Sequence, residues 1–354
     1  MTAIPAPRTV VERALGIGVL VLMAIGPLVF TEYWISFILT QTFLIGVAAA
    51  SLIFLSAYGG MVSLAQAAIY GISAFVLGNV VTRGEAKGLH LGWNPWIGIL
   101  LAIVITTVVA LVFGALASRS FGIYFLMITL TFAVVAFYFF GQVTKVSGFS
   151  GIAGIDSYTP GFVGSPTNQP NRLYYLALVI AVLVYALIRY IVRTPFGISL
   201  QGIRDEPLRM GSLGFNVALH RTLAFVLAGL LASLAGILYG WWNGVVAPDN
   251  VGLGATVDLL IVCVIGGLGR IEGAWIGAFV FIVINNYVRD VSLPVVGGSF
   301  NTIIGLVFLA IVIVSPDGLM GAWDRLASQF FGRRGGAPPV AGEPRAVATG
   351  TGPG

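Results

Sequence analysis

Residues 96–117 read Trp96-Ile-Gly-Ile-Leu-Leu-Ala-Ile-Val-Ile-Thr-Thr-Val-Val-Ala-Leu-Val-Phe-Gly-Ala-Leu-Ala117, an apolar run without one charged side chain. About 20 such residues allow a helix to cross the roughly 30 Å hydrocarbon core of a bilayer. The whole 354-residue chain is 58% hydrophobic and 9% charged, whereas a soluble domain carries about 25% charged residues. We therefore predict an all-α fold, a polytopic transmembrane helical bundle, and exclude a disordered chain, a disulfide scaffold and most soluble enzymes.

Nine other apolar runs bring the prediction to about ten membrane spans. Three runs, the third, eighth and ninth, are short or interrupted by polar residues, so nine or eleven spans remain open. The first run follows Arg8 and Arg13, and no small-residue cleavage site follows it, which indicates a retained span rather than a signal peptide. The predicted spans are 14–31, 35–57, 64–82, 96–117, 121–141, 173–192, 222–242, 254–269, 273–288 and 300–315.

The basic residues predict the orientation of these spans. If the N-terminus lies inside, 13 of the 18 basic residues fall on the inner side and five on the outer side. Because Lys and Arg are enriched in cytoplasmic loops, we expect both termini to be cytoplasmic. The predicted parts are a cytoplasmic N-terminal segment (1–13), a transmembrane domain (14–321) with a cytoplasmic loop at 193–221, and a cytoplasmic, largely disordered tail (322–354).

Residues that carry enzyme chemistry are scarce in the sequence. The two histidines, His90 and His220, fall on opposite predicted sides, and Cys263 is the sole cysteine, so we expect no zinc-type ligand cluster. Neither Lys87 nor Lys145 follows a glycine or precedes a serine or threonine, so the sequence has no Walker A phosphate loop. We therefore expect a protein that is not an enzyme, has no catalytic or metal-binding residue and binds no cofactor of its own.

Asp258 is the one acidic residue that falls clearly inside a predicted span. Ion-coupled transporters usually bury several ionisable groups near the middle of the membrane. Counted along its own span, Asp258 lies about one turn from the outer end, so we expect its side chain to extend to the interface. The alternative, a polar contact inside the bundle or the translocation pathway, remains open.

The inner loop 193–221 has the pattern of a short amphipathic helix. Asp205 is expected to cap its N-terminus, with Pro207 in the first turn, and Gly214 is expected to end it in a left-handed conformation. Such a helix can dock into a groove on a soluble protein or lie at the lipid headgroups. The mixed acidic and basic charges favour a protein partner. The apolar residues between the caps are Leu208, Met210 and Leu213, and the basic residue is Arg209.

Two glycine-rich stretches, 58–71 and 265–277, share a Gly-Gly pair, a short polar segment and a small-residue helix start. Transporters often use interrupted helices at matching places in two halves to line a path. The alternative, that any two glycine-rich membrane turns look alike, is equally open.

Six short motifs occur in a fixed order along the chain. Together they resemble the inner-membrane permease subunits of branched-chain amino acid ABC importers, from about the second span to Gly321. The sequence departs from the family pattern at Ala65, where the family has glycine, and at 148–154. The motifs are Ser63-Leu-Ala-Gln-Ala-Ala-Ile69, Arg119-Ser-Phe-Gly-Ile-Tyr-Phe125, Pro195-Phe-Gly-Ile-Ser-Leu-Gln-Gly-Ile-Arg-Asp-Glu206, Leu213-Gly-Phe-Asn216, Gly266-Gly-Leu-Gly-Arg-Ile-Glu-Gly273 and Pro316-Asp-Gly-Leu-Met-Gly321.

The resemblance implies a translocation subunit that moves a small polar solute, a branched-chain or related amino acid, across a bacterial inner (plasma) membrane by alternating access. Urea, short amides and aromatic acids are the alternative solutes, and an ion-coupled secondary transporter is the alternative from another class. The implied partners are a second permease subunit, two cytoplasmic ATP-binding subunits that use the ATP, an external substrate-binding protein and membrane lipid, with no nucleic acid.

The resemblance also implies roles for particular residues. Those expected to couple the chain to the ATPases are Gly197, Arg204, Asp205, Glu206 and Gly214. Those expected along the translocation pathway are Ser63, Gln66, Asp258, Gly266, Gly267 and Gly269. The other explanation for the glycines is that they serve turn geometry alone.

Overall fold

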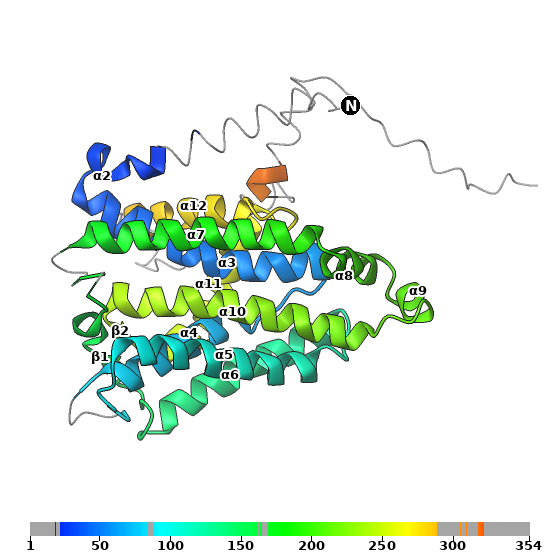
Figure 1. The fold of residues 1–354 in the computed structure, drawn as a ribbon, viewed down its shortest axis with the longest axis horizontal. Helices are drawn as coiled ribbons and strands as arrows, with labels where there is room; N and C mark the ends of the chain where they lie inside the picture. The colour runs from blue at the N-terminus through cyan, green and yellow to red at the C-terminus, as the bar shows by residue number, and fades with distance from the viewer. Residues whose placement is uncertain are drawn as a thin grey trace, which may run out of the picture.

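The computed structural model describes residues 18, 22–83, 88–161, 163–164, 169–288, 305, 309 and 318–321, and these residues form a bundle of helices (Figure 1). Five helical stretches in this part are long and apolar enough to cross a membrane. They are a π-helical turn continuous with α3 (Trp34–Leu39 and Thr40–Gly59), α5 (Pro95–Ala117), α6 (Ile123–Gln142), α7 (Pro170–Arg193) and α10 (Val217–Asn243).

Three shorter apolar helices complete the bundle: α4 (Gln66–Val81), α11 (Leu253–Gly266) and α12 (Gly273–Val288). The predicted helical membrane bundle is therefore confirmed, and eight of the predicted spans correspond to helices. The predicted span 14–31 lies mostly outside the described residues, which include α2 (Gly26–Val29), and the span 300–315 lies almost entirely outside them. The predicted segments 1–13 and 322–354 also lie outside them, so the count of ten and the location of the termini stay predictions.

The helices differ in how much of their surface the bundle covers. In Trp34–Gly59, 89% of the apolar 18-residue core of the helix is buried in the bundle. The corresponding share is only 22% in α5 and in α7. The apolar side chains that α5 and α7 leave exposed are suited to lipid tails. The stretch Trp34–Gly59 is therefore central to the bundle, and α5 and α7 lie at its periphery.

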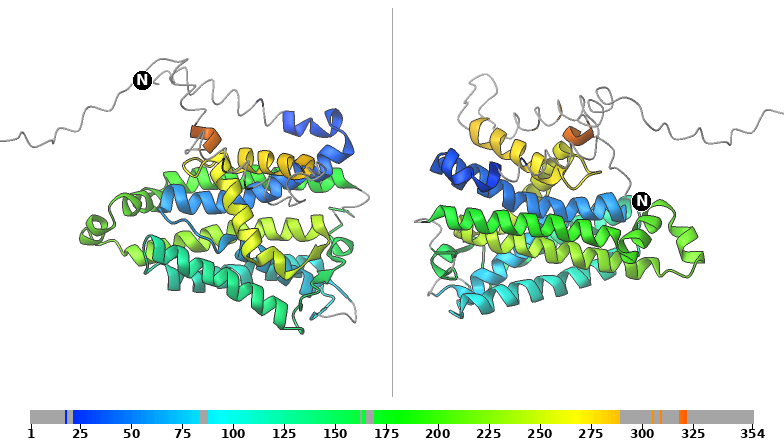
Figure 2. Two further views of the ribbon diagram at one scale, coloured as in Figure 1. Left: turned by 180° about the vertical axis from the view of Figure 1, so that it is seen from behind. Right: turned by 45° about the horizontal axis from the view of Figure 1, so that its top comes forward.

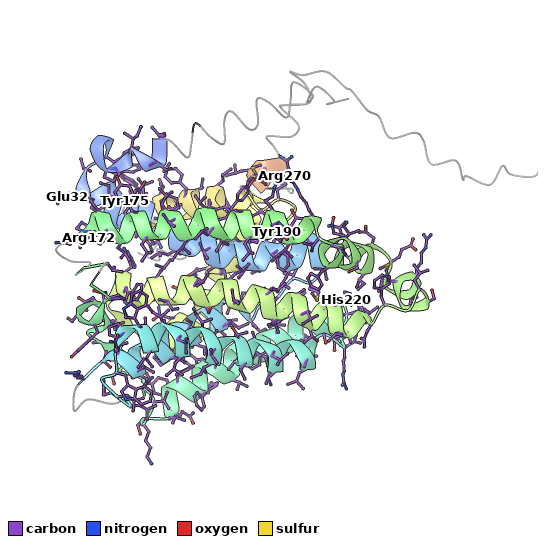
Figure 3. All side chains as sticks on the ribbon, viewed as in Figure 1. Glu32, Arg172, Tyr175, Tyr190, His220 and Arg270 are labelled. Atoms are coloured by element: carbon purple, nitrogen blue, oxygen red, sulfur yellow. The ribbon has the colours of Figure 1, made fainter. Side chains whose placement is uncertain are left out.

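A small antiparallel ribbon and a pair of short helices mark the two ends of the bundle (Figure 1). We call one the ribbon end, where β1 (Ile152–Ala153) pairs with β2 (Val245–Val246) beside the 3₁₀ turns Ile155–Tyr158 and Pro248–Val251. The other is the loop end, where α8 (Pro195–Asp205) and α9 (Pro207–Ser212) project. Arg172 lies near the ribbon end and His220 towards the loop end (Figure 3). The ribbon is a small departure from the all-α prediction.

Close packing between α10 and α4 depends on Gly236. A Cβ atom at this position would clash with the carbonyl oxygen of Tyr70 and lie 2.9 Å from the Cβ of Ser73. In the next turn of the same helix, a Cβ at Gly240 would meet its nearest atom at 3.5 Å, an ordinary contact. The two helices can therefore approach this closely only because position 236 has no side chain.

We expect Gly236→Ala to destabilise the bundle by about 1–3 kcal/mol, the usual cost of overpacking a core. Gly240→Ala is the matched control and should have a much smaller effect, because its Cβ has room. Thermal unfolding of the detergent-purified chain measures the difference. Equal melting temperatures for the two variants would contradict the close-packing argument.

Candidate functional site

The turn between α7 and α8 is built around Gly197. The Thr194 hydroxyl donates to the Ile191 carbonyl at 2.6 Å and accepts the Gly197 N–H at 3.4 Å, which caps the N-terminus of α8. A Cβ at Gly197 would overlap the Ile191 carbonyl oxygen and lie 2.5 Å from the Val192 Cα. Because these neighbours are backbone atoms, only glycine lets α8 fold back this tightly against the end of α7.

Arg204 fastens α8 to the end of α3. Its Nη1 donates to the carbonyl oxygen of Ala57, and its Nε donates to Asp205 Oδ1 at 2.8 Å. The carbonyls in the last turn of a helix carry a partial negative charge, so a guanidinium there is favourable. Arg204 therefore binds its own chain, and its hydrogen bond lowers the pKa of the exposed Asp205 carboxyl below its ordinary value.

Asp205 does not cap α9, contrary to the sequence prediction. Asp205 is the last residue of α8, and Glu206 holds the N-cap position of α9 without a side-chain capping bond. The Glu206 carboxylate lies 3.7 Å from Arg209 Nη1, and both side chains are mostly exposed. Such a surface pair contributes little stability, so Glu206 and Arg209 remain accessible to a partner.

Gly214 ends α9 as predicted, with φ of +91°. The Phe215 N–H donates to the Met210 carbonyl at 3.1 Å across this turn, a bond typical of a glycine-terminated helix. The apolar residues of α9 do not pack inside the chain, since Leu208 is 90% exposed and Leu213 is 66% exposed. We call these two side chains, with Glu206 and Arg209, the α9 tip.

The segment after α3 turns back into the bundle, and α4 begins inside it. The Leu64 N–H donates to Thr129 Oγ1 of α6 at 3.1 Å, and the fully buried Ser63 accepts the Ala65 N–H at 3.3 Å. Gln66, the first residue of α4, accepts a hydrogen bond from Ser51 at 3.1 Å. Ser51 precedes the last residue of α3 by eight positions, so Gln66 lies roughly 12 Å inside the loop end.

Gln66 also has an unsatisfied donor, because its buried Nε2 has no hydrogen-bond partner among the described residues. A helix N-terminus carries partial positive charge, and transporters commonly use such interrupted helices within the membrane. The structure therefore brings Ser63 and Gln66 together at one membrane-embedded helix start.

The turn between α11 and α12 brings Gly266 and Gly267 together for reasons of backbone geometry. Gly267 has φ of +107°, and a Cβ at Gly266 would overlap the Gly273 carbonyl oxygen. Gly269 is different, since no atom lies within 4 Å of its Cβ position. Next to this turn, Glu272 accepts the Tyr185 hydroxyl at 2.9 Å and lies 3.5 Å from Arg189 Nη1, which links the turn to α7.

Arg221 of α10 binds the turn between α5 and α6, a role that no sequence motif predicted. It is 3% exposed, and its Nη1 donates to the carbonyl oxygens of Ser118 at 3.0 Å and Ser120 at 2.7 Å. Its guanidinium lies over the Phe121 ring, 4.2 Å from the centroid, and its Nε is 3.0 Å from Met61 Sδ. The sequence did contain one signal for this role, a single arginine in the second turn of the apolar helix α10. A charge buried there needs hydrogen-bond partners.

Two arginines thus hold the segment that leads from α3 to α4. Arg204 binds Ala57 in the last turn of α3, just before the segment, and Arg221 contacts Met61 within it. The segment continues through Ser63 to Gln66, inside the bundle. The contacts form a continuous connection from α8 at the loop end to the embedded start of α4.

Fold and site together define an integral membrane transport protein of the permease class. Its family model, described as the branched-chain amino acid transport system / permease component, matches residues 34–315. The chain belongs to this family of ABC importer permeases.

Two relatives are named high-affinity branched-chain amino acid transport system permease protein LivM. The one from Escherichia coli is 25% identical over 45% of this chain and 36% of its own, and the one from Salmonella typhimurium is 22% identical over 74% and 64%. The chain thus spans about one third to two thirds of their lengths. The galactose/methyl galactoside import permease protein MglC of Salmonella typhimurium is 28% identical over 42% of this chain and 44% of its own. No solved structure matches the chain.

Proposed function

We propose that the chain is the translocation subunit of an ABC importer that carries branched-chain or related amino acids across a bacterial inner membrane. The observation that carries this proposal is the exposed α9 tip, held by Arg204 through α8 to the central helix α3. Partners would be a second permease subunit, two cytoplasmic ATP-binding subunits and an external substrate-binding protein. The α9 tip would dock on an ATP-binding subunit, with the loop end facing the cytoplasm.

The mechanism follows from the contacts of α8. Closure of the ATP-binding subunits would shift the α9 tip and α8 with it. Arg204 would pass this shift to the end of α3, and the segment clamped by Arg204 and Arg221 would pass it to the start of α4. The chain would thereby alternate between conformations open to each side, while ATP hydrolysis would take place on the partners.

The names of the two LivM relatives support an amino acid as the solute. The relative named for galactose and methyl galactoside shows that related chains carry names for other solutes.

We expect the double variant Leu208→Glu/Leu213→Glu to lose leucine uptake and substrate-stimulated ATP hydrolysis together. Two charges would replace the apolar side chains that an ATP-binding subunit would cover, and desolvating unpaired charges is costly. The assay is uptake and ATPase activity of the assembled importer in proteoliposomes. Leu89→Glu is the matched control, because Leu89 is 55% exposed in the connection between α4 and α5 at the ribbon end. Unchanged coupling in the double variant would overturn the docking role of the α9 tip.

A further inference from the structure

The 3₁₀ turn Pro248–Val251, which precedes α11, leads from the ribbon end into the bundle. A Cβ at Gly71 of α4 would overlap Val251 Cγ1 and lie 3.2 Å from the Asn250 carbonyl oxygen. Gly71 precedes the last residue of α4 by ten positions, or about 15 Å along that helix. On the other side, a Cβ at Gly252 would lie 3.1 Å from the Phe137 ring of α6. The start of α11 is therefore already within the bundle.

Because α11 starts inside the bundle, Asp258 lies deeper in the bundle than its position along the predicted span suggests. Cys263 Sγ of α11 lies 3.6 Å from the carbonyl oxygen of Ala49. Ala49 is about 15 Å from the loop end of α3 and about 22 Å from Trp34, at 1.5 Å per residue. Asp258 precedes Cys263 by five residues in a helix that crosses the long helices obliquely (Figure 2, left). Its short side chain is near the middle of the bundle and cannot extend to either end.

The carboxylate of Asp258 has no partner in the described part of the chain. No hydrogen bond or ion pair joins it to another described residue, and it lies on an exposed face of α11 with Gly254. Asp249, in the turn that leads into α11, is a second exposed carboxylate without such a partner. A charge at this depth is strongly disfavoured against lipid tails and normally faces a polar path or another subunit.

We propose that this face of α11 borders the translocation path between the chain and its second permease subunit, and that the Asp258 carboxylate binds an ammonium group of the solute. The proposal rests on the proposed function and names the chemistry of its site. Asp258 and Asp249 are two carboxylates without a partner among the described residues, and negative charge along a path attracts cations. An amino acid carries the required ammonium group, whereas a neutral sugar does not.

The first test measures water access and local charge without measuring transport. A cysteine is placed at Gly254, one turn from Asp258 on the same face, in the assembled importer with Cys263→Ala. We expect a cationic trimethylammonium methanethiosulfonate to react at least about tenfold faster than its anionic sulfonate counterpart, because a negative site concentrates cations. Adding Asp258→Asn should remove most of this preference. Val108→Cys, on the exposed face of α5, is the lipid-facing control and should react with neither reagent.

The second test asks whether the carboxylate recognises the ammonium group. We expect Asp258→Asn to raise the KM for leucine uptake at least about tenfold, the usual scale for losing a charged hydrogen bond, and Asp258→Glu to retain most of the affinity. The probe is 4-methylpentanoate, which has the leucine skeleton and carboxylate but no ammonium group. It should compete poorly in the wild type, and its disadvantage relative to leucine should shrink in Asp258→Asn.

The outcomes separate the two proposals. An unreactive Gly254→Cys would overturn the path assignment, whatever the transport result. A charge preference that Asp258→Asn leaves undiminished, or a KM for leucine that it leaves unchanged, would overturn ammonium binding. A wild-type importer that does not transport leucine would contradict the proposed function, and the labelling ratio would still decide whether α11 borders an acidic, water-filled path.

Discussion

Replacing Arg221 with methionine is expected to destabilise the bundle by about 2–5 kcal/mol and to reduce uptake severely. Methionine fills similar space but leaves the carbonyl oxygens of Ser118 and Ser120 without their donor. The buried Ser118 carbonyl would cost about 1–3 kcal/mol without a partner, the half-buried Ser120 carbonyl less, and the contact with the Phe121 ring is also lost. The turn between α5 and α6 would then separate from α10.

Two further variants make this prediction specific. Arg221→Lys keeps the charge, but an ammonium lacks the planar fork of a guanidinium, so we expect an intermediate loss. Arg193→Met removes an exposed arginine at the same end of the bundle and should have little effect. Thermal unfolding in detergent measures all three variants. If Arg221→Met melted at the same temperature as Arg193→Met, the organising role of Arg221 would be wrong.

A single methyl group at Gly197 is the second change with a large expected effect. Gly197→Ala would push against the backbone of Ile191 and Val192, which cannot move aside as a flexible side chain can. Overpacking of this kind costs about 1–3 kcal/mol, and relief requires α8 to swing away from α7. We expect uptake and ATPase stimulation to fall at least about tenfold together, because displacements of about 1 Å can cost 10²-fold in activity.

Gly211→Ala is the matched control for this change. Gly211 lies in α9 of the same loop, and no atom lies within 4 Å of its Cβ position. Alanine also favours a helix more than glycine does, so transport should remain near the wild-type level. Membrane insertion should be unchanged in both variants, because neither change lies in a long span. Normal coupling in Gly197→Ala would show that the fold of α8 against α7 is not needed.

The sequence predicted the helices of the bundle closely because a membrane helix depends on the length of an apolar run. The run 96–117 became α5 at Pro95–Ala117, and the run 273–288 became α12 with the same bounds. Gly214 was also predictable, because glycine is the residue that ends helices in a left-handed conformation.

The remaining features depend on contacts between distant residues. The capping role predicted for Asp205 was wrong because Thr194 and Pro195 start a helix earlier, and that helix runs through Asp205. The carbonyls that bind Arg221 lie about a hundred positions away in the chain, so no local sequence pattern predicts them. The depth of Asp258 depends on where Val251 packs against Gly71, whereas counting along a span assumes that the span starts at the membrane surface.

Arg204 and Arg221 bind main-chain oxygens of Ala57, Ser118 and Ser120, so their attachment does not depend on the side chains at those three positions. In evolutionary terms, Ala57 and Ser120 are free to drift to other residues of suitable size, while the two arginines are not. Ser118 is more constrained, because its hydroxyl accepts a hydrogen bond from the Thr222 hydroxyl at 2.9 Å. An alanine scan would therefore be asymmetric, with large effects at the two arginine donors and a small effect at Ser120. Correlated substitutions at pairs of positions would not reveal these contacts either. A backbone oxygen is present whatever the residue, so no change at the acceptor position can compensate for a change of the arginine.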